Sequence, residues 1–305
     1  MASTVLITGA SQGIGKATAL RFALEKYNVV LAARQPDRLE AAAAEVRALG
    51  QQALAIPTDV RSIDQVTAMV QQAIAHFGQI DVLINDASIY YMGPIEAASL
   101  EDWQQIINTN LWGYIHTIHT LLPHFLERGE GTIVNISSIG GLDPIPYQVP
   151  YTTSKFAVTG LTKSLRAELA PKGIRVHGIY PSFIRTQLME RGLFRGNQEE
   201  TAQARYELVD RAFHSPLLET PEDVANAIWK GMKHHKPDVL VGTAKLWTTL
   251  YHTVPGLVNP IVRRVFGMSD RHLANSANYR SSETSQLPLD DKLNDKHDDS
   301  LYSKN

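Results

Sequence analysis

A tyrosine and a lysine four residues apart, Tyr151 and Lys155, have the types and spacing suited to proton transfer. On a helix this spacing puts both side chains on one face, about one turn apart. A free tyrosine has a pKa near 10, and lowering that pKa by about 2 units requires roughly 3 kcal/mol of preference for the phenolate. A lysine charge about 5 Å away supplies about that much at an effective dielectric constant of about 20. The pair could therefore exchange a proton with a substrate without a metal ion.

A serine thirteen residues before the tyrosine, Ser138, could hold a carbonyl oxygen between its hydroxyl and the phenol of Tyr151. It follows the apolar segment 132–137, which is typical of a buried strand. In parallel α/β sheets, ligands bind at the carboxyl ends of the strands, which is where Ser138 would lie. A tyrosine and a lysine at this spacing also occur on solvated helices, so the catalytic interpretation depends on the rest of the chain.

A glycine-rich segment near the N-terminus, Thr8-Gly9-Ala10-Ser11-Gln12-Gly13-Ile14-Gly15, follows the apolar segment 4–8 and precedes a helical pattern. Strand, glycine-rich turn and helix form the context of a dinucleotide-binding fingerprint. Gly9 permits a tight turn, Gly13 lets the backbone approach a pyrophosphate, and Gly15 lets the helix pack closely on the strand. The helix N-terminus then offers N–H groups to the phosphates. The alternative is a glycine-rich turn with a structural role only.

Arg34 follows the second predicted strand, 29–33, which ends in Ala33. In dinucleotide-binding folds an acidic residue at this place binds the 2′-hydroxyl of NAD, whereas a nearby arginine accommodates the 2′-phosphate of NADP. A charge-assisted hydrogen bond to phosphate contributes roughly 1.5–3 kcal/mol. We therefore expect a preference for NADP(H) over NADH of about ten- to a hundredfold. The alternative is that Arg34 caps the helix that follows.

Strands and helices alternate steadily along the chain up to residue 243. Strands are predicted at 4–8, 29–33, 51–56, 80–84, 132–137, 174–179 and 238–241, and the main helices at 37–49, 63–77, 100–126, the segment from 151, and 221–235. This alternation predicts one α/β domain, a Rossmann-like doubly wound parallel sheet of about seven strands with helices on both faces. The long polar segment 187–217 is predicted to be a substrate lid.

Two polar residues within this pattern have open interpretations. Asp59 lies at a strand end, where it could contact the adenine amino group or cap the next helix. Asn110 lies inside a predicted helix, where an amide lowers helix propensity, so it marks either a kink or a site.

His116 and His119 are spaced as metal ligands can be, but without an evident carboxylate partner we expect them on the helix surface and predict no metal site.

Composition excludes several classes of protein. The chain has 305 residues, a formal net charge of −2 and 44% hydrophobic residues, which is ordinary for a globular protein. Near-neutral charge gives no reason to expect nucleic acid as a partner. The absence of cysteine excludes disulfides and thiolate chemistry, and it is consistent with a cytoplasmic protein. The first residues lack a basic region before a long apolar run, so we do not expect a signal peptide. No apolar run approaches the ~20 residues needed to cross a bilayer.

The pattern changes beyond residue 243. Segment 244–268 is apolar but interrupted by Pro255 and Pro260, so we expect it to dock on the domain, form a subunit contact, or lie on a membrane surface. Segment 269–305 is polar and poor in branched apolar residues, and it is predicted to be disordered.

Taken together, these motifs resemble the short-chain dehydrogenase/reductase family in its classical form, over roughly residues 4–241. The resemblance depends on motifs that occur in the family's order: Thr8-Gly9-x3-Gly13-x-Gly15, Asp59, Asn85-x-Ala87, Asn110, Ser138 and Tyr151-x3-Lys155. The interval between Ser138 and Tyr151 is the family's usual one, which selects Ser138 over Ser137.

The resemblance implies a role for each residue. Tyr151 would be the general acid or base, Lys155 would hold the nicotinamide ribose and lower the Tyr151 pKa, Ser138 would polarise the substrate oxygen, and Asn110 would support a water chain to Lys155. The residues expected to bind the cofactor are Gly9, Ser11, Gln12, Gly13, Ile14, Gly15, Arg34, Asp59, Val60, Asn85, Ala87, Tyr151, Lys155, Pro181 and Thr186.

The expected function is an NADP(H)-dependent oxidoreductase that interconverts a ketone or aldehyde and its alcohol, in a homodimer or homotetramer paired through the helices that hold Asn110 and Tyr151. The alternatives are a non-catalytic NADP(H)-binding regulatory protein and a surface-associated protein that depends on 245–268. The sequence departs from the family at Asp86, Ser88 and Ser182, where the family pattern has Asn, Gly and Gly. All three lie beside the expected cofactor.

Overall fold

The computed structural model describes residues 2–185, 188, 192–196, 199–213 and 218–253. The main sheet contains strands β1 (Thr4–Thr8), β2 (Asn28–Ala33), β3 (Ala53–Pro57), β4 (Val82–Asn85), β6 (Gly131–Ile136), β7 (Ile174–Pro181) and β9 (Asp238–Val241). The helices include α1 (Gly13–Leu24), α2 (Pro36–Ala48), α3 (Ile63–Phe77), α4 (Leu100–Ile107), α5 (Gly113–Arg128), α6 (Val149–Leu169), α7 (Glu199–Phe213), α8 (Pro221–Lys233) and α9 (Ala244–Thr253). The predicted strands and main helices are all present, with bounds shifted by a few residues.

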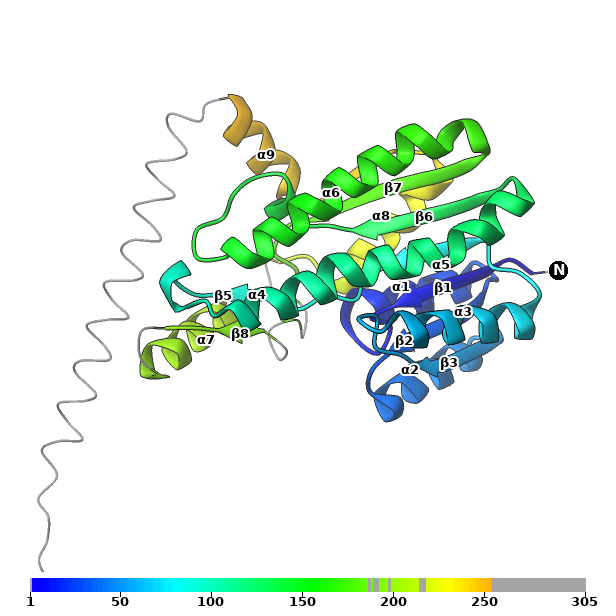
Figure 1. Cartoon of the computed structure of the whole chain (residues 1–305), viewed down its shortest axis with the longest axis horizontal. Coiled ribbons are helices and arrows are strands. Elements are labelled where there is room, and N and C mark those ends of the chain that lie inside the picture. The colour runs from blue at the N-terminus through cyan, green and yellow to red at the C-terminus, as the bar shows by residue number, and fades with distance from the viewer. Residues whose placement is uncertain (1, 186–187, 189–191, 197–198, 214–217, 254–305) are drawn as a thin grey trace, which may run out of the picture.

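The main sheet is parallel throughout, in the order β3-β2-β1-β4-β6-β7-β9. From β1 the chain builds outward through β2 and β3, and it then returns to the other side of β1 with β4 (Figure 1). This reversal confirms the predicted doubly wound fold. Loops leave the sheet in opposite directions at such a reversal, so a crevice opens at the carboxyl ends of β1 and β4.

Two apolar cores hold helices on opposite faces of the sheet. One core joins the sheet to α1, α2 and α8 through side chains such as Phe22, Leu39 and Ile228. The other joins it to α3, α5 and α6 through side chains such as Met69 and Phe125. The central strands are buried on both sides, which explains why they are continuous apolar runs rather than alternating ones.

The helix predicted over 100–126 is interrupted by a π-helical turn, Asn108–Trp112, between α4 and α5. Gly113 follows this turn and packs on Val60, and a β-carbon there would lie 2.6 Å from the Val60 Cγ2 atom. His116 contributes to the same contact, with Nδ1 2.9 Å from the carbonyl oxygen of Val60. The amide at Asn110 therefore does mark a break in α-helical geometry.

A small second sheet lies beside the end of the main one. It pairs β5 (Tyr91–Met92) with β8 (Leu193–Phe194), which comes from the segment predicted to be a lid. Helix α7 follows β8 and lies next to it (Figure 1). Neither short strand was predicted, because two residues carry no periodic pattern.

The C-terminal elements complete the described chain. Thr220 and Asp223 form a capping box that begins α8, as the predicted Thr220 cap requires. Helix α9 packs Ala244 against Ile139 and Ile145, and His252 Nε2 lies 3.1 Å from Asp143 Oδ1. The remainder of the apolar segment, 254–268, and the tail 269–305 lie outside the described residues. Within those described, no helix is both long and apolar enough to span a membrane.

Candidate active site

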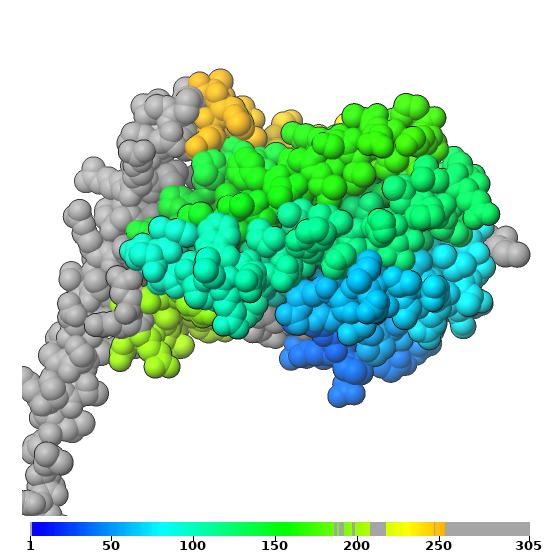
Figure 2. Space-filling view, in the orientation of Figure 1, coloured from blue at the N-terminus to red at the C-terminus, as the bar shows by residue number. Residues whose placement is uncertain are grey.

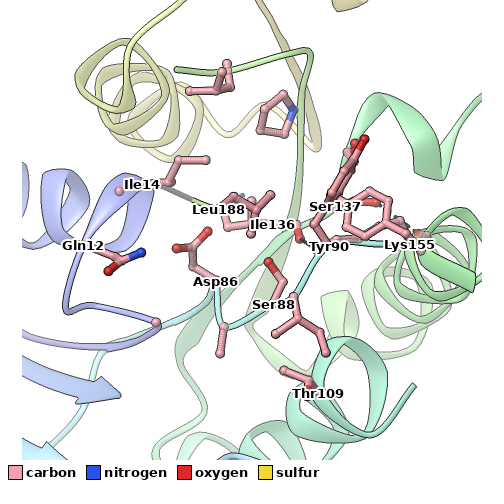
Figure 3. A pocket seen from close by; sticks show the side chains of 18 of the residues that line it. Gln12, Ile14, Asp86, Ser88, Tyr90, Thr109, Ile136, Ser137, Lys155 and Leu188 are labelled. Atoms are coloured by element: carbon pink, nitrogen blue, oxygen red, sulfur yellow. Dashed lines mark hydrogen bonds between the residues drawn. The ribbon is translucent and has the colours of Figure 1, made fainter. Parts of the chain in front are cut away.

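A pocket lies at the carboxyl ends of β1, β4, β6 and β7, where the sheet order reverses. The glycine-rich turn after β1 lines one end, and Ser138, Tyr151 and Lys155 line the other. Figure 3 shows Gln12 and Ile14 on one side of this space and Ser137, Tyr90 and Lys155 on the other, with Asp86 and Ser88 between them.

The glycine-rich turn requires glycine for two separate reasons. Gly9 and Gly13 have φ angles of +72° and +55°, which side chains disfavour. Gly15 has no room for a side chain, because a β-carbon there would lie 2.6 Å from the carbonyl oxygen of Gly9. Thr8 Oγ1 accepts hydrogen bonds from the N–H groups of Asp86 and Ala87, which fixes the turn after β4 against the turn after β1.

The residues around this turn fit a bound dinucleotide. The N-cap residue of α1, Gln12, makes no side-chain cap hydrogen bond, so its side chain satisfies none of the backbone N–H groups of the first helical turn. The hydroxyl of Ser11 is buried and has no hydrogen-bond partner within the described residues. Unsatisfied donors at a helix N-terminus are suited to phosphate oxygens. Arg34 lines the same end of the pocket.

Arg34, Asp59 and Val60 all line the pocket. The α2 N-cap is Gln35 and the α3 N-cap is Ser62, so the two capping alternatives for Arg34 and Asp59 are wrong. Asp59 instead accepts hydrogen bonds from Arg61, with its Oδ2 2.6 Å from Arg61 Nη2. Burial raises the pKa of the Asp59 carboxyl, but the hydrogen bonds from Arg61 outweigh it and hold that pKa below its usual value.

The three predicted catalytic side chains converge at the other end. The Ser138 side chain acts on the Tyr151 hydroxyl and lowers the phenol's pKa, and the Ser138 Oγ accepts a hydrogen bond from the N–H of Gly140. Lys155 Nζ lies 5.7 Å from the Tyr151 ring centre and donates to the carbonyl oxygen of Ile136 at 2.9 Å. Ser137 points away into α6, because its Oγ contacts the Lys155 carbonyl and Thr159. Of the two serines, Ser138 is the one that acts on the phenol.

One electrostatic expectation is wrong for the chain in this state. Burial raises the pKa of Tyr151 to about 12, the Ser138 hydrogen bond lowers it, and the Asp86 charge raises it further. Burial also lowers the pKa of Lys155 to about 8, opposed by Asp86. The lysine charge is therefore shared with a neighbouring carboxylate, and it does not offset the cost of burying a phenolate. Tyr151 is a protonated phenol at neutral pH, suited to donating a proton.

Asp86 is a carboxyl group in the middle of this pocket. Burial raises its pKa to about 7, while the Lys155 charge and a backbone hydrogen bond from Gly15 lower it. The side chain thus interacts with the amide groups of α1 on one side and with the lysine on the other. Its position in the sequence was recognised as a departure from the family pattern, but its charge coupling to Lys155 was not.

Asn110 joins the segment after β4 to helix α6. Its Oδ1 accepts from the N–H of Ile89 at 2.8 Å, and its Nδ2 donates to the Ile89 carbonyl and to Ser154 Oγ, each at 3.0 Å. Ser154 Oγ in turn donates to the carbonyl oxygen of Tyr151. Asn110 is fully buried and does not line the pocket. In this structure it fixes the backbone that presents Tyr151.

Most predicted site residues line the pocket: Gly9, Gln12, Gly13, Ile14, Arg34, Asp59, Val60, Ala87, Ser138, Tyr151, Lys155 and Pro181. Ser11, Gly15, Asn85 and Asn110 lie behind its described lining. Asn85 has a structural role, because its amide donates to Asn135 Oδ1 and accepts from Thr117 Oγ1 inside the core. Thr186 lies outside the described residues.

The sequence reasoning missed most of the residues around Tyr151. Tyr90 packs edge-on against Tyr151, with 5.1 Å between ring centres, and Ile139, Ile145, Gln148 and Leu188 also line the pocket. The aromatic pair Tyr90-Tyr91 after β4 was the available signal, since two large aromatic residues in a loop rarely lie in solvent.

Comparison with known proteins identifies the family. The family model described as short chain dehydrogenase matches residues 3–193. The chain belongs to the short-chain dehydrogenase family. It is 38% identical over 185 residues to the 3-oxoacyl-[acyl-carrier-protein] reductase FabG of Staphylococcus aureus, covering 60% of this chain and 75% of that protein. It is 34% identical over 276 residues to the ketoacyl reductase HetN of Nostoc, covering 88% of this chain and 90% of HetN.

Solved short-chain dehydrogenases have the same fold. A Burkholderia phymatum enzyme in complex with NAD superposes with a TM-score of 0.77 at 27% identity, covering 84% of this chain and 95% of that one. Actinorhodin polyketide ketoreductase with NADPH superposes with a TM-score of 0.67 at 31% identity, covering 75% and 89%. The likeness to HetN extends over a larger share of this chain than the likeness to FabG.

Proposed function

We propose that this chain is an NADP(H)-dependent oxidoreductase that reduces a ketone or aldehyde to its alcohol, and catalyses the reverse oxidation. The observation that carries the proposal is the convergence of Ser138, Tyr151 and Lys155 on one end of a pocket whose other end is a glycine-rich turn. A protein that only binds a dinucleotide would need the turn, but it would not need a serine, a phenol and a lysine together at the opposite end.

Each of these side chains has its own role in the proton transfer. A bound nicotinamide cofactor would supply the hydride. Tyr151, held protonated by burial, donates its proton to the developing alkoxide oxygen, and Ser138 hydrogen-bonds that oxygen. Lys155 holds positive charge beside the phenol and stabilises the phenolate left behind. Asn110 acts as a positioning residue through Ser154 and Ile89, and a water relay to Lys155 stays a prediction.

The substrate class follows from the relatives and from the pocket. FabG and HetN are a 3-oxoacyl-carrier-protein reductase and a ketoacyl reductase, so a 3-oxoacyl thioester is the first substrate we propose. Tyr90, Ile139, Ile145 and Leu188 give the Tyr151 end an apolar lining that is suited to an acyl chain.

Cofactor preference is proposed from Arg34. It lines the pocket directly after β2, which ends in Ala33 and so offers no carboxylate for a ribose hydroxyl. The solved relatives include complexes with NAD and with NADPH, so the family as a whole accepts either cofactor. The guanidinium at Arg34 favours the one that carries a 2′-phosphate.

Self-association is proposed through α4, α5 and α6. Figure 2 shows these helices forming much of one face of the molecule. Trp112 and Phe156 in this region are 48% and 41% exposed. A contact between subunits would remove these two side chains from water. Light scattering that shows a dimer or tetramer would support the proposal, whereas a monomer would contradict it.

The test is oxidation of NADPH and NADH over a panel of 3-oxoacyl thioesters, ketones and aldehydes, with Tyr151→Phe measured in parallel. We expect turnover with NADPH that the variant loses by about a hundredfold or more, while NADPH binding by fluorescence is retained. NADPH binding without turnover on any substrate would contradict the enzymatic proposal.

A further inference from the structure

The carboxyl group of Asp86 lies inside the pocket, and the mechanism proposed above does not use it. Figure 3 shows its side chain projecting from the end of β4 into the space between Gln12 and Ile14 on one side and Ser137 and Lys155 on the other. A dinucleotide that reached from the glycine-rich turn to Tyr151 would pass this group. The inference below therefore rests on the proposed cofactor binding.

The backbone prevents Asp86 from moving away. Its N–H and that of Ala87 both donate to Thr8 Oγ1, at 3.1 and 3.2 Å. Gly9 packs so closely that a β-carbon there would lie 2.9 Å from the Ala87 nitrogen. The preceding residue, Asn85, is fixed by Asn135 and Thr117. The backbone of Asp86 is therefore held in a rigid turn between two strand ends, which keeps its side chain in the pocket.

Charged and titratable groups surround the carboxyl from three elements. Lys155 and Tyr151 act on it from α6, and Tyr114 from α5. From α1 comes a backbone hydrogen bond from Gly15, at the helix end that would hold a pyrophosphate. An ionised Asp86 thus occupies the N–H of Gly15, an amide group suited to a phosphate oxygen. It also places a negative charge beside the negative charges of the cofactor phosphates.

We propose that Asp86 links cofactor binding to proton uptake: the dinucleotide binds the form of the protein in which the Asp86 carboxyl carries a proton. Like charges in a poorly hydrated site disfavour each other, so an ionised carboxylate opposes the pyrophosphate. A protonated carboxyl removes that opposition and can donate a hydrogen bond to a phosphate oxygen. The family pattern has asparagine at this position, and its side chain carries no charge and takes up no proton.

The expected consequence is a cofactor affinity that falls as pH rises. The pKa of Asp86 is raised to about 7, so the protonated form is abundant below that pH and declines above it. Above that pKa, the dissociation constant should increase by about tenfold for each pH unit. Loss of the Lys155 proton at higher pH acts in the same direction, so the experiment must separate the two groups.

The decisive variant is Asp86→Asn, which keeps the shape of the side chain and removes the charge. Titration calorimetry with NADP⁺ between about pH 7 and about pH 9 should show binding to the variant about tenfold tighter than to wild type near pH 8. The control is Asp59→Asn, which removes another pocket carboxyl, one paired with Arg61 and held at a low pKa. Because Asp59 stays ionised throughout this range, replacing it can change the cofactor affinity only by a factor that does not depend on pH.

Infrared difference spectroscopy identifies the proton carrier directly. Adding NADP⁺ near pH 8 should produce the carbonyl stretch of a protonated carboxyl in wild type and in Asp59→Asn, with an isotope shift when aspartate is carbon-13 labelled, and no such band in Asp86→Asn. Should Asp86→Asn fail to fold, the labelled wild type and Asp59→Asn decide alone.

The outcomes separate this inference from the proposed function. Equal affinities and equal pH dependence in wild type and Asp86→Asn, or no aspartate band on binding, would overturn the role of Asp86 and leave the enzyme proposal intact. Failure of wild type to bind NADP⁺ or NADH at any pH would instead overturn the proposed function.

Discussion

The two ends of the pocket are built in different ways. The cofactor end is built mainly from backbone: the turns after β1 and β4 are fixed by Thr8 Oγ1 and by Gly9 and Gly15, where side chains would not fit. The substrate end consists of side chains from separate segments, such as Tyr90, Tyr151 and Leu188. From this difference we expect that this chain sets its substrate specificity at the substrate end.

The substrate end is held together by polar and aromatic contacts. Asp102 at the start of α4 accepts hydrogen bonds from Arg195, just after β8, with 2.9 Å from Nε to Oδ2. Phe194 and Tyr206 pack edge-on with ring centres 5.0 Å apart, and Arg205 lies 4.8 Å from the centre of the Tyr147 ring. Breaking one such contact should loosen this end and leave the cofactor end unchanged.

Lys155→Ala should have the largest effect, because this lysine belongs to both ends. We expect kcat to fall by about 10³-fold and NADPH binding to weaken together. The control is Lys163→Ala, an exposed lysine on the same helix. Steady-state kinetics and fluorescence titration measure the two effects. A variant that kept the wild-type kcat and NADPH affinity would contradict the proton-transfer role of Lys155.

Arg34→Asp should abolish the preference for NADPH over NADH without affecting the substrate end. We expect the ratio of kcat/KM for NADPH over NADH to fall by about ten- to a hundredfold, the value of one charge-assisted bond to phosphate. KM for the carbonyl substrate should stay the same. An unchanged ratio would mean that Arg34 does not contact the cofactor.

Asn110→Ala tests the link between the two ends. It removes three hydrogen bonds from a fully buried amide, so the free energy of unfolding should fall by about 2–3 kcal/mol. The matched control is Asn108→Ala, an exposed asparagine in the same π-helical turn, which should change little. Denaturant unfolding measures both, and equal losses would show that the turn, not the bonds, is what matters.

Asp102→Asn should have the smallest effect of these four substitutions, and we expect that effect at the substrate end only. Burial raises the pKa of Asp102, but the Arg195 and Ser99 hydrogen bonds outweigh it and hold that pKa below its usual value. The pair therefore stabilises above about pH 4 and loses that contribution in stronger acid. We expect KM for substrate to rise several-fold with NADPH affinity unchanged, while Glu101→Gln, an exposed neighbour, changes neither. A change in NADPH affinity instead would contradict the division between the ends.

The sequence predicted the glycine-rich turn and the set Ser138, Tyr151 and Lys155, but it missed the other residues around Tyr151, for physical reasons. Gly9, Gly13 and Gly15 are dictated by local backbone geometry, which a short motif records. Tyr90 packs on Tyr151, and Arg195 bonds to Asp102, through contacts between distant segments that no local periodicity records.

The pKa of Tyr151 lies above its usual value and not below it, because burial and the charge of Asp86 raise it, and the spacing of Tyr151 and Lys155 shows neither of these. Helix spacing places a charge near a phenol, but it does not reveal what else surrounds the pair. That information comes only from the folded arrangement.

The most direct test of the central claim is transfer of deuterium from NADPH labelled at the hydride position to a 3-oxoacyl thioester, followed by mass spectrometry of the product. The account predicts a single deuterium on the carbon that was the ketone, with transfer slowed at least about a hundredfold in Tyr151→Phe. Tight binding of labelled NADPH with no deuterium in any product of the carbonyl panel would contradict it.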